Sequence, residues 1–463
     1  MRPVWALAPL VLAGVAGLAG CSAVLSFDEC KVDTDCTKNG AAFCTSDHLC
    51  VGLLPAERLC TGGIVPDKPA ADAVYIAGLF HLSGDLGDKD TQLANAARLA
   101  VEQIAQVTSR PIAMVLCDTT NDVAVRSVEE AVRRYKAVAV VGPTTSTELL
   151  ALAPTVVQDG LLVISPSATT PAVTALSDGD LIWRTCGSDT LQAPVLAGLI
   201  PQMTSGHNTI VDVAYVDSSY GDGLKTAFVS EWSAKSGATV ASTVKFAEGT
   251  GGSDMVYQRL VQDNPDYTVF VADTDAAAIM AKLYASAAAS TTQYLFTDGG
   301  KGPGLFGPTP VTTVLDRVRG TAPATPSVAD PTFANFKLAY QDRFNSDPST
   351  TSFVANTYDA TFAIALAIAG TNGPVGPAQL VSAMRRMAAT TGIVVEVKPA
   401  TDFVKGATAL AQGGSINLTG ASGPLSWDGA GDITDAPIEV WGVKTNVSPP
   451  IFCSLPTGVG PCP

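Results

Sequence analysis

Two successive series of apolar strands and helices fill the middle of the chain, and they constrain its fold more than any other feature. Short apolar runs alternate with stretches such as Asp90–Ile104, where Leu93, Ala97 and Ala100 lie at helical spacing. The runs are nearly continuous, which is typical of strands in a parallel sheet covered on both faces. They are Val74–Phe80, Pro111–Cys117, Ala137–Val141 and Leu161–Ile164, then Thr209–Val216, Val240–Phe246, Tyr267–Ala272 and Thr292–Thr297. Two series of similar size predict an α/β protein with two doubly wound lobes, whose ligand sites lie at the carboxyl ends of the strands.

The last third of the sequence favours helices, at Pro331–Phe344, Phe353–Ala369 and Pro377–Ala389. A turn-rich stretch from Gly413 to Gly431, a strand at Ile438–Val443 and a tail rich in Pro and Cys follow. The segment Ala360–Ala369 is apolar on all sides, but it has about half of the ~20 residues that a membrane-spanning helix needs. We therefore expect it to be a buried helix.

The N-terminus has the pattern of a secretory signal. Arg2 precedes an apolar stretch from Val4 to Leu18, and small residues then lead into Cys21. This pattern predicts a signal peptide over residues 1–20 and a lipoprotein that begins at Cys21, held to a membrane by its acyl chains. An ordinary cleaved signal with a chance cysteine is the alternative. Ser22 after the lipidated residue favours the outer membrane in a Gram-negative cell, with the protein facing the periplasm or the cell surface.

Composition limits the partners. The chain has 463 residues, 47% of them apolar, and a net charge of −15. It has no basic run, so a nucleic-acid partner is not expected. Only three histidines are present, and no metalloprotease, serine-hydrolase or Walker A string occurs. We therefore expect no enzyme activity, no cofactor and no metal; the glycine-rich stretch Gly299–Gly304 is interpreted as a flexible turn.

The chain has ten cysteines, and export would bring them into an oxidising compartment where disulfides form. Residues 21–65 form a cysteine-rich module that is too small and polar for a hydrophobic core, so disulfides should hold it together. No CxxC pair occurs in it, which argues against zinc. After lipidation one thiol must remain unpaired or bridge to another chain. The disulfide candidates are Cys30, Cys36, Cys44, Cys50, Cys117, Cys186, Cys453 and Cys462, with Cys60 just outside the cluster of four.

Hydroxyl residues follow two neighbouring strands of the first lobe. One loop is Gly142–Glu148, and the other is Ser165–Pro171. Both precede expected helices, whose free N–H groups attract anions. The alternative is that these Ser and Thr residues only cap the helices. Two such loops side by side favour a site for a small anion such as a carboxylate.

The second lobe carries complementary groups after its strands, namely Tyr220, Asp273, Asp275 and Asp298. Carboxylates there could receive an ammonium group. The alternative is that these Asp residues cap helices or lie solvated at loop tips.

The sequence resembles the type I periplasmic binding proteins, in the branch of the leucine/isoleucine/valine-binding proteins. The resemblance covers about Asp72 to Lys444 and is carried by these strings: Gly142–Leu161, Ser165–Pro171 with Thr174, Trp183–Asp189 with Gln192, Tyr220–Leu224, and Gly423–Asp428 with Gly431 and Asp432. It implies a hinge of three crossings between lobe 1 (residues 72–189 and 324–425) and lobe 2 (190–323 and 426–444), with 445–463 as a tail.

The resemblance also implies site residues. Ser146, Thr169 and the Ser167 backbone would bind a ligand α-carboxylate, Asp298 would bind its ammonium, and Tyr220 would cover it. Asp275 lies about where relatives with aliphatic ligands carry an aromatic residue, so a polar or cationic ligand is a further expectation.

Thr120 and Thr145 stand at the two positions of a disulfide seen in some relatives, so that bridge is absent. Cys117 and Cys186 are predicted to replace it. The leading hypothesis is a monomeric, membrane-anchored receptor that captures a small zwitterion, an amino acid, by lobe closure and delivers it to an ABC permease. The alternative is a surface sensor with the same fold and no transporter.

Overall fold

The structure of the chain is a computed structural model. It describes residues 35, 42–44, 50–52, 58–84, 86–121, 123–203, 209–235, 238–287, 289–389, 391–398, 401–456 and 462. The chain divides into two compact units, Met1–Glu57 and Arg58–Pro463. In the first unit, β1 (Ala42–Cys44) and β2 (Cys50–Gly52) form a two-stranded antiparallel sheet that places Cys44 opposite Cys50. The predicted lipidation site Cys21 and the disulfide candidates Cys30 and Cys36 lie outside the described residues.

Lobe 1 of the second unit is built on a six-stranded sheet in the order β3-β5-β4-β6-β7-β8. Its strands are β3 (Ile64–Val65), β4 (Val74–Phe80), β5 (Ile112–Asp118), β6 (Ala139–Val141), β7 (Leu162–Ser165) and β8 (Ile182–Arg184). All neighbours pair in parallel except β3, which runs antiparallel to β5 at the edge. The strands expected from the first apolar series therefore form one parallel sheet.

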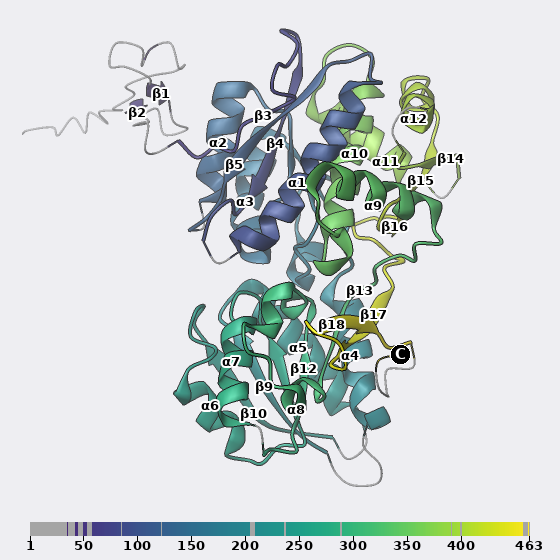
Figure 1. The fold of residues 1–463 in the computed structure, drawn as a ribbon. Coiled ribbons are helices and arrows are strands. Elements are labelled where there is room, and N and C mark those ends of the chain that lie inside the picture. Colours follow the sequence, from purple (N-terminus) through teal and green to yellow (C-terminus); the bar gives the residue numbers. More distant parts are fainter. Residues whose placement is uncertain are drawn as a thin grey trace, which may run out of the picture. The chain divides into compact units, whose positions relative to one another are not determined.

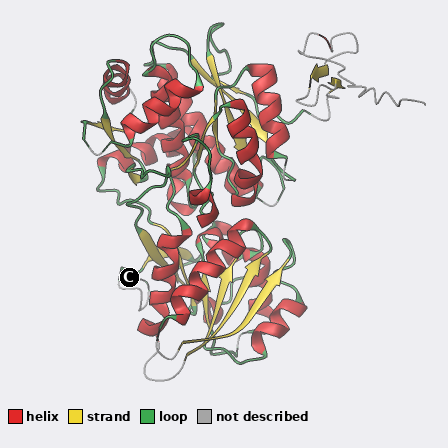
Figure 2. Cartoon of the chain, turned by 180° about the vertical axis from the view of Figure 1, so that it is seen from behind, coloured by secondary structure: helices red, strands yellow, loops and turns green. Residues whose placement is uncertain are grey.

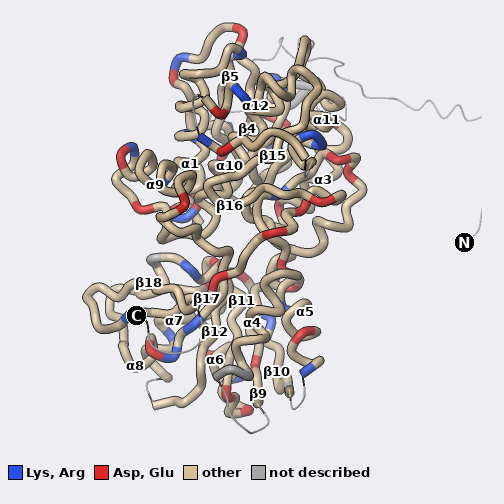
Figure 3. The backbone as a smooth tube through the Cα atoms, turned by 90° about the vertical axis from the view of Figure 1, so that its right-hand side faces the viewer, with Lys and Arg blue, Asp and Glu red and all other residues tan. Residues whose placement is uncertain are grey.

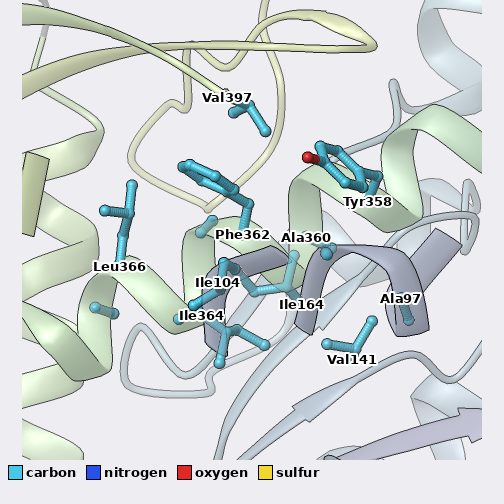
Figure 4. Packing of buried hydrophobic residues seen from close by; sticks show 14 of the residues in the cluster. Ala97, Ile104, Val141, Ile164, Tyr358, Ala360, Phe362, Ile364, Leu366 and Val397 are labelled. Carbon is cyan, nitrogen blue, oxygen red and sulfur yellow. The ribbon is translucent and has the colours of Figure 1, made fainter. Parts of the chain in front are cut away.

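Helices cover both faces of this sheet because alternate strand residues are apolar on each side. Ile76 and Met114 pack toward α1 and α10, whereas Ala77 and Val115 pack toward α2 and α3. Figure 4 shows Ile364 of α10 beside Ile104 of α1. The helices of lobe 1 are α1 (Gly87–Ala105), α2 (Ala124–Tyr135), α3 (Ser146–Asp159), α9 (Pro331–Phe344), α10 (Val354–Ala369), α11 (Pro377–Met387) and α12 (Thr401–Ala411).

Lobe 2 repeats this plan on a seven-stranded sheet in the order β10-β9-β11-β12-β13-β17-β18. Its elements are α4 (Asp189–Met203), β9 (Thr209–Val216), α5 (Ser219–Ser233), β10 (Ala238–Phe246), α6 (Asp254–Val261), β11 (Tyr267–Val271), α7 (Ala276–Ser286), β12 (Gln293–Phe296), α8 (Thr312–Leu315), β13 (Val318–Pro323), β17 (Ile438–Lys444) and β18 (Ile451–Ser454). Strands β10, β9, β11, β12 and β13 pair in parallel. Strand β17 runs antiparallel to β13, and β18 runs antiparallel to β17. Helices α4 and α5 cover one face, and α6, α7 and α8 cover the other (Figure 2).

The chain passes between the lobes three times, after β8, after β13 and before β17 (Figure 1). Two of the strings that carry the family resemblance meet at these crossings. Arg184 in the string Trp183–Asp189 donates to Asp432 at the end of the last string, with Nε and Oδ1 2.7 Å apart, and the guanidinium is fully buried. The indole N–H of Trp427 donates to the carbonyl oxygen of Arg184 at 2.6 Å. A buried, fully hydrogen-bonded ion pair therefore fixes the hinge segments to each other.

Several sequence expectations need correction. Cys117 is bonded to Cys60, and Cys186 is a buried free thiol, so the predicted Cys117–Cys186 bridge is wrong. Strand β3 explains the difference, because it brings the segment after Cys60 alongside β5, which contains Cys117. Cys453 and Cys462 are bonded to each other.

Two predicted boundaries also move. Residues 58–65 belong with the main body and not with the cysteine-rich module. The tail after residue 445 contributes β18 to the lobe 2 sheet. The stretch predicted as turns from Gly413 to Gly431 contains β15 (Ile416–Gly420) and β16 (Gly423–Pro424), which form a small sheet with β14 (Ile393–Glu396).

Candidate functional site

A cavity of about 140 Å³ lies between the carboxyl ends of the strands of the two lobes. A larger groove of about 990 Å³, lined by Tyr75, Arg110 and Phe403, lies at the amino-terminal ends of the lobe 1 strands. Ligands of open α/β sheets bind beyond the carboxyl ends, so the smaller cavity is the candidate site. Acidic segments lie near the junction of the lobes in Figure 3.

Hydroxyl groups form the lobe 1 wall of the cavity. Gly142 has a φ of +99°, and a Cβ there would lie 2.5 Å from the carbonyl oxygen of Leu79, so the turn after β6 requires glycine. This turn leads to Thr145, the N-cap of α3, whose side chain accepts a hydrogen bond from the Glu148 N–H. Ser146, the first helical residue, accepts from the Thr170 N–H at 3.3 Å. Its hydroxyl proton is therefore free to be donated into the cavity.

The second hydroxyl loop lies beside the first. The Ser167 hydroxyl donates to the Thr144 carbonyl oxygen at 2.7 Å, and both residues line the cavity. Thr169 is buried behind this wall, where its hydroxyl lies against the buried Asp189 carboxyl. The structure thus brings Ser146 and Ser167 to the cavity and Thr169 next to it.

Asp298 and Tyr220 form the lobe 2 wall. The Tyr220 hydroxyl donates to Asp298 Oδ1 at 2.9 Å and lies 2.7 Å from the Thr297 hydroxyl. Only 3% of Asp298 is exposed. Burial raises the pKa of Asp298, although the charge of Lys89 and the Tyr220 hydrogen bond act in the opposite direction. A cationic group in the cavity would stabilise the charged carboxylate at this position.

Asp275 does not belong to this wall. It is buried, and its two carboxyl oxygens accept from the N–H groups of Gly249 and Gly251 at 3.0 and 2.7 Å. Asp275 therefore holds the loop after β10 and does not line the cavity, contrary to the expectation. Asp273, two residues earlier, takes the cavity position.

Two cations that the sequence analysis did not single out enter the cavity from lobe 1. Lys89 on α1 reaches across to Asp273 of lobe 2, with Nζ 3.0 and 3.2 Å from the two carboxyl oxygens. Burial alone would lower the pKa of Lys89, but Asp273 and Asp90 outweigh it and raise that pKa. The position of Lys89 shortly after the end of β4 was the available signal, because carboxyl ends of strands line such sites.

His81 directly follows β4, and its Nε2 lies 3.1 Å from Glu148 Oε2. Burial lowers the pKa of His81, but Glu148 and Asp90 reverse this and raise it to about 9. The imidazole therefore carries a positive charge at neutral pH. The lobe 1 wall thus combines hydroxyl donors with positive charge, and the lobe 2 wall is acidic.

The lobes also touch around the cavity. The Ser219 N–H of lobe 2 donates to the Thr147 hydroxyl of lobe 1 at 3.1 Å, and the Ser352 hydroxyl contacts the Asp298 carbonyl oxygen at 3.4 Å. The structure therefore shows the two lobes in contact over the cavity.

Within the described residues, no three His, Cys, Asp or Glu side chains gather in a way that could hold a metal ion. No helix in that part of the chain is both long and apolar enough to cross a membrane.

A family model described as periplasmic binding protein matches residues 73–411, which is most of the chain. The chain belongs to the periplasmic binding protein family. This is a family of solute-binding proteins and not of enzymes, and membership implies action outside the cytoplasm. The predicted family and the predicted two-lobe fold are both confirmed.

One curated relative is the chemotactic signal transduction system substrate-binding protein BasB of Halobacterium salinarum, 25% identical over 80% of this chain and 89% of that protein. The leucine-binding protein LivK of Thermotoga maritima has a similar fold, with a TM-score of 0.65, 21% identity, and coverage of 82% of this chain and 97% of LivK. A solute-binding protein of an ABC transporter from Rhodopseudomonas palustris, in complex with 3,4-dihydroxybenzoic acid, has a TM-score of 0.64, 18% identity, and coverage of 82% and 95%.

Proposed function

We propose that this protein captures a zwitterionic amino acid in the cavity between its lobes and delivers it to an ABC permease. The observation that carries the proposal is the opposed chemistry of the two walls. Hydroxyl donors on lobe 1 suit a carboxylate, and the buried Asp298 on lobe 2 suits an ammonium group. A ligand that satisfies both walls at once stabilises the closed arrangement, which is the basis of hinge closure.

Ser146, Thr169 and the Ser167 backbone are proposed to hold the ligand carboxylate, and Asp298 its ammonium, with Tyr220 covering it. The Ser146 hydroxyl supports this role, because it lines the cavity and its proton is free to be donated to a ligand oxygen. Each charge-assisted hydrogen bond contributes about 1.5–3 kcal/mol. A few of them, less the costs of desolvation and closure, give an affinity on the order of micromolar.

The test is calorimetric titration of the full chain with a panel of L-amino acids, followed by the Asp298→Asn variant. We expect at least one amino acid to bind the wild type, and the variant to bind it roughly tenfold to a hundredfold more weakly. The melting temperature of the ligand-free variant should not fall, because burial disfavours the carboxylate that is removed. Asp254→Asn is the control, since that carboxylate is 78% exposed on lobe 2. Unchanged affinity in Asp298→Asn would remove this residue from the site.

A sensor function is the second candidate, and the similarity to BasB favours it. That relative is named as part of a chemotactic system, and it aligns with most of this chain. In a strain that lacks this protein, loss of ligand uptake would support delivery to a permease. Loss of chemotaxis with normal uptake would support the sensor.

We also propose that the mature protein is a monomer anchored by lipid at Cys21, in the outer membrane. The signal-like pattern before Cys21 and the following Ser22 support this proposal. Metabolic labelling with palmitate should mark the wild type and leave Cys21→Ala unlabelled. Label on both proteins, or on neither, would exclude lipidation at Cys21.

A further inference from the structure

The charged residues of the cavity wall are unequal in number on the two lobes. Lobe 1 contributes two cations, Lys89 and His81. Lobe 2 contributes four carboxylates, which are Asp217, Glu248, Asp273 and Asp298. The wall therefore has more negative than positive charge before any ligand enters.

Each cation of the wall already has a carboxylate partner. Lys89 pairs with Asp273, and His81 pairs with the buried Glu148 behind the wall. Lys245 lies 2.7 Å from Asp217 and offsets that charge at the exposed rim. Lys89 also acts on Asp298 through its charge, but it is bound to Asp273, so the two wall cations are fewer than the carboxylates around them.

Asp298 and Glu248 are the carboxylates that remain. No ion pair joins either of them to a cation in the part of the chain that the structure describes. Asp298 accepts from Tyr220, and Glu248 Oε1 accepts from the Thr274 hydroxyl at 3.1 Å. Closing the lobes over a net-neutral ligand would leave this negative charge uncompensated and partly desolvated.

The chain itself shows that this end of the cavity accommodates an ammonium group. The Lys89 ammonium contacts Asp273 and lies 5.8 Å from the centre of the Phe353 ring. Leu86 and Val216 also line the cavity and offer apolar surface. An unbranched methylene chain that ends in a cation matches such a combination of apolar and acidic groups.

Building on the proposed function, we propose that the ligand is an amino acid with a positively charged side chain. Its α-ammonium offsets Asp298, and its side-chain cation lies between Glu248 and Asp273. Asp273 is shared with Lys89, so Glu248 is the residue that distinguishes a cationic side chain from a neutral one of the same length.

The test compares L-lysine with L-norleucine, which has the same carbon skeleton without the side-chain amine. Calorimetric titrations use the full chain, with L-ornithine, L-leucine and L-glutamate as further probes. We expect L-lysine or L-ornithine to bind at least about tenfold more tightly than L-norleucine, a difference of about 1.4 kcal/mol. Because Glu248 is exposed, Glu248→Gln should weaken the cationic ligand by only about two- to fivefold and leave L-norleucine unchanged. Glu231→Gln removes the same charge from an exposed position of α5 and should change neither.

Tighter binding of L-leucine, L-norleucine or L-glutamate than of both cationic amino acids would overturn this inference and leave the proposed function intact. Equal loss in Glu248→Gln and Glu231→Gln would also overturn it, because the effect would then be that of overall charge. If none of the amino acids binds, the proposed function fails together with the inference.

Discussion

A methyl group at Gly223 should keep the two lobes from closing fully. Gly223 lies in α5 of lobe 2, and a Cβ at this position would be 2.6 Å from the Thr170 hydroxyl oxygen and 3.2 Å from Pro171 Cδ, both of lobe 1. Contacts below 3.0 Å require something to move. Thr170 is buried, so rotation of its side chain gives limited relief. In Gly223→Ala the lobes must therefore move apart to relieve part of the close contact, and in Gly223→Val they must relieve most of it.

The same substitution should have opposite effects on stability and on binding. Alanine inside a helix is favoured over glycine by about 1 kcal/mol, so the ligand-free protein should melt at the same or a higher temperature. Overfilling a packed contact costs about 1–3 kcal/mol. If this free-energy cost is added to the closing of the lobes over the ligand, the ligand dissociation constant rises about 5- to 150-fold. Calorimetric titration and thermal melts of the same preparations measure both quantities.

Gly198→Ala is the matched control. Gly198 also lies inside a helix, α4, and a Cβ there would meet no atom within 4 Å. This variant should show a similar stability and unchanged affinity. If Gly223→Val binds its ligand as tightly as the wild type, contact between the lobes is not needed for binding, and the closure argument is refuted.

Three other predictions concern stability. The pKa of His81 in the folded protein is raised to about 9. Its pairing with Glu148 therefore stabilises the fold fully below pH ~6.5 and progressively less as pH rises to 9. The melting temperature of His81→Gln should not show this loss of stability between pH ~6.5 and about 9. Burial raises the pKa of Asp212 to about 7, so ionisation of this carboxyl destabilises the fold as pH rises from ~4 to 7. Asp212→Asn should therefore have a higher melting temperature than the wild type at about pH 8 but not at about pH 4. Replacing Cys60 and Cys117 together with alanine should lower the free energy of unfolding by about 2–4 kcal/mol in denaturant titrations, and no change would mean that the bridge is not formed.

The regular elements could be predicted wherever local chemistry was decisive. The continuous apolar run Val74–Phe80 is β4, and Pro331–Phe344 is α9, whose N-cap Asp330 accepts from the first N–H groups of the helix. The region from 393 to 420 was harder. Ile393 and Val394 are exposed in β14, so no burial pattern indicated a strand there.

The site could be predicted only in part, because loop geometry decides which side chains reach the cavity. Asp273 and Asp275 both follow β11, yet one faces the cavity and the other binds the backbone of Gly249 and Gly251. Nothing local in the sequence separates them. Lys89 was missed for a related reason, since its partner Asp273 lies on the other lobe. The Cys60–Cys117 pair likewise depends on a two-residue edge strand that carries no periodic signal.

The central claim is that an amino acid binds between the lobes, with its carboxylate on the Ser146 side and its ammonium on Asp298. A crystal structure of the full chain grown with the tightest-binding amino acid of the titration panel tests it most directly. We expect ligand density that joins the Ser146 hydroxyl to the Asp298 carboxylate, with Lys89 beside it. Density for the ligand elsewhere, or a cavity filled by Lys89 with no room for a ligand, would contradict it.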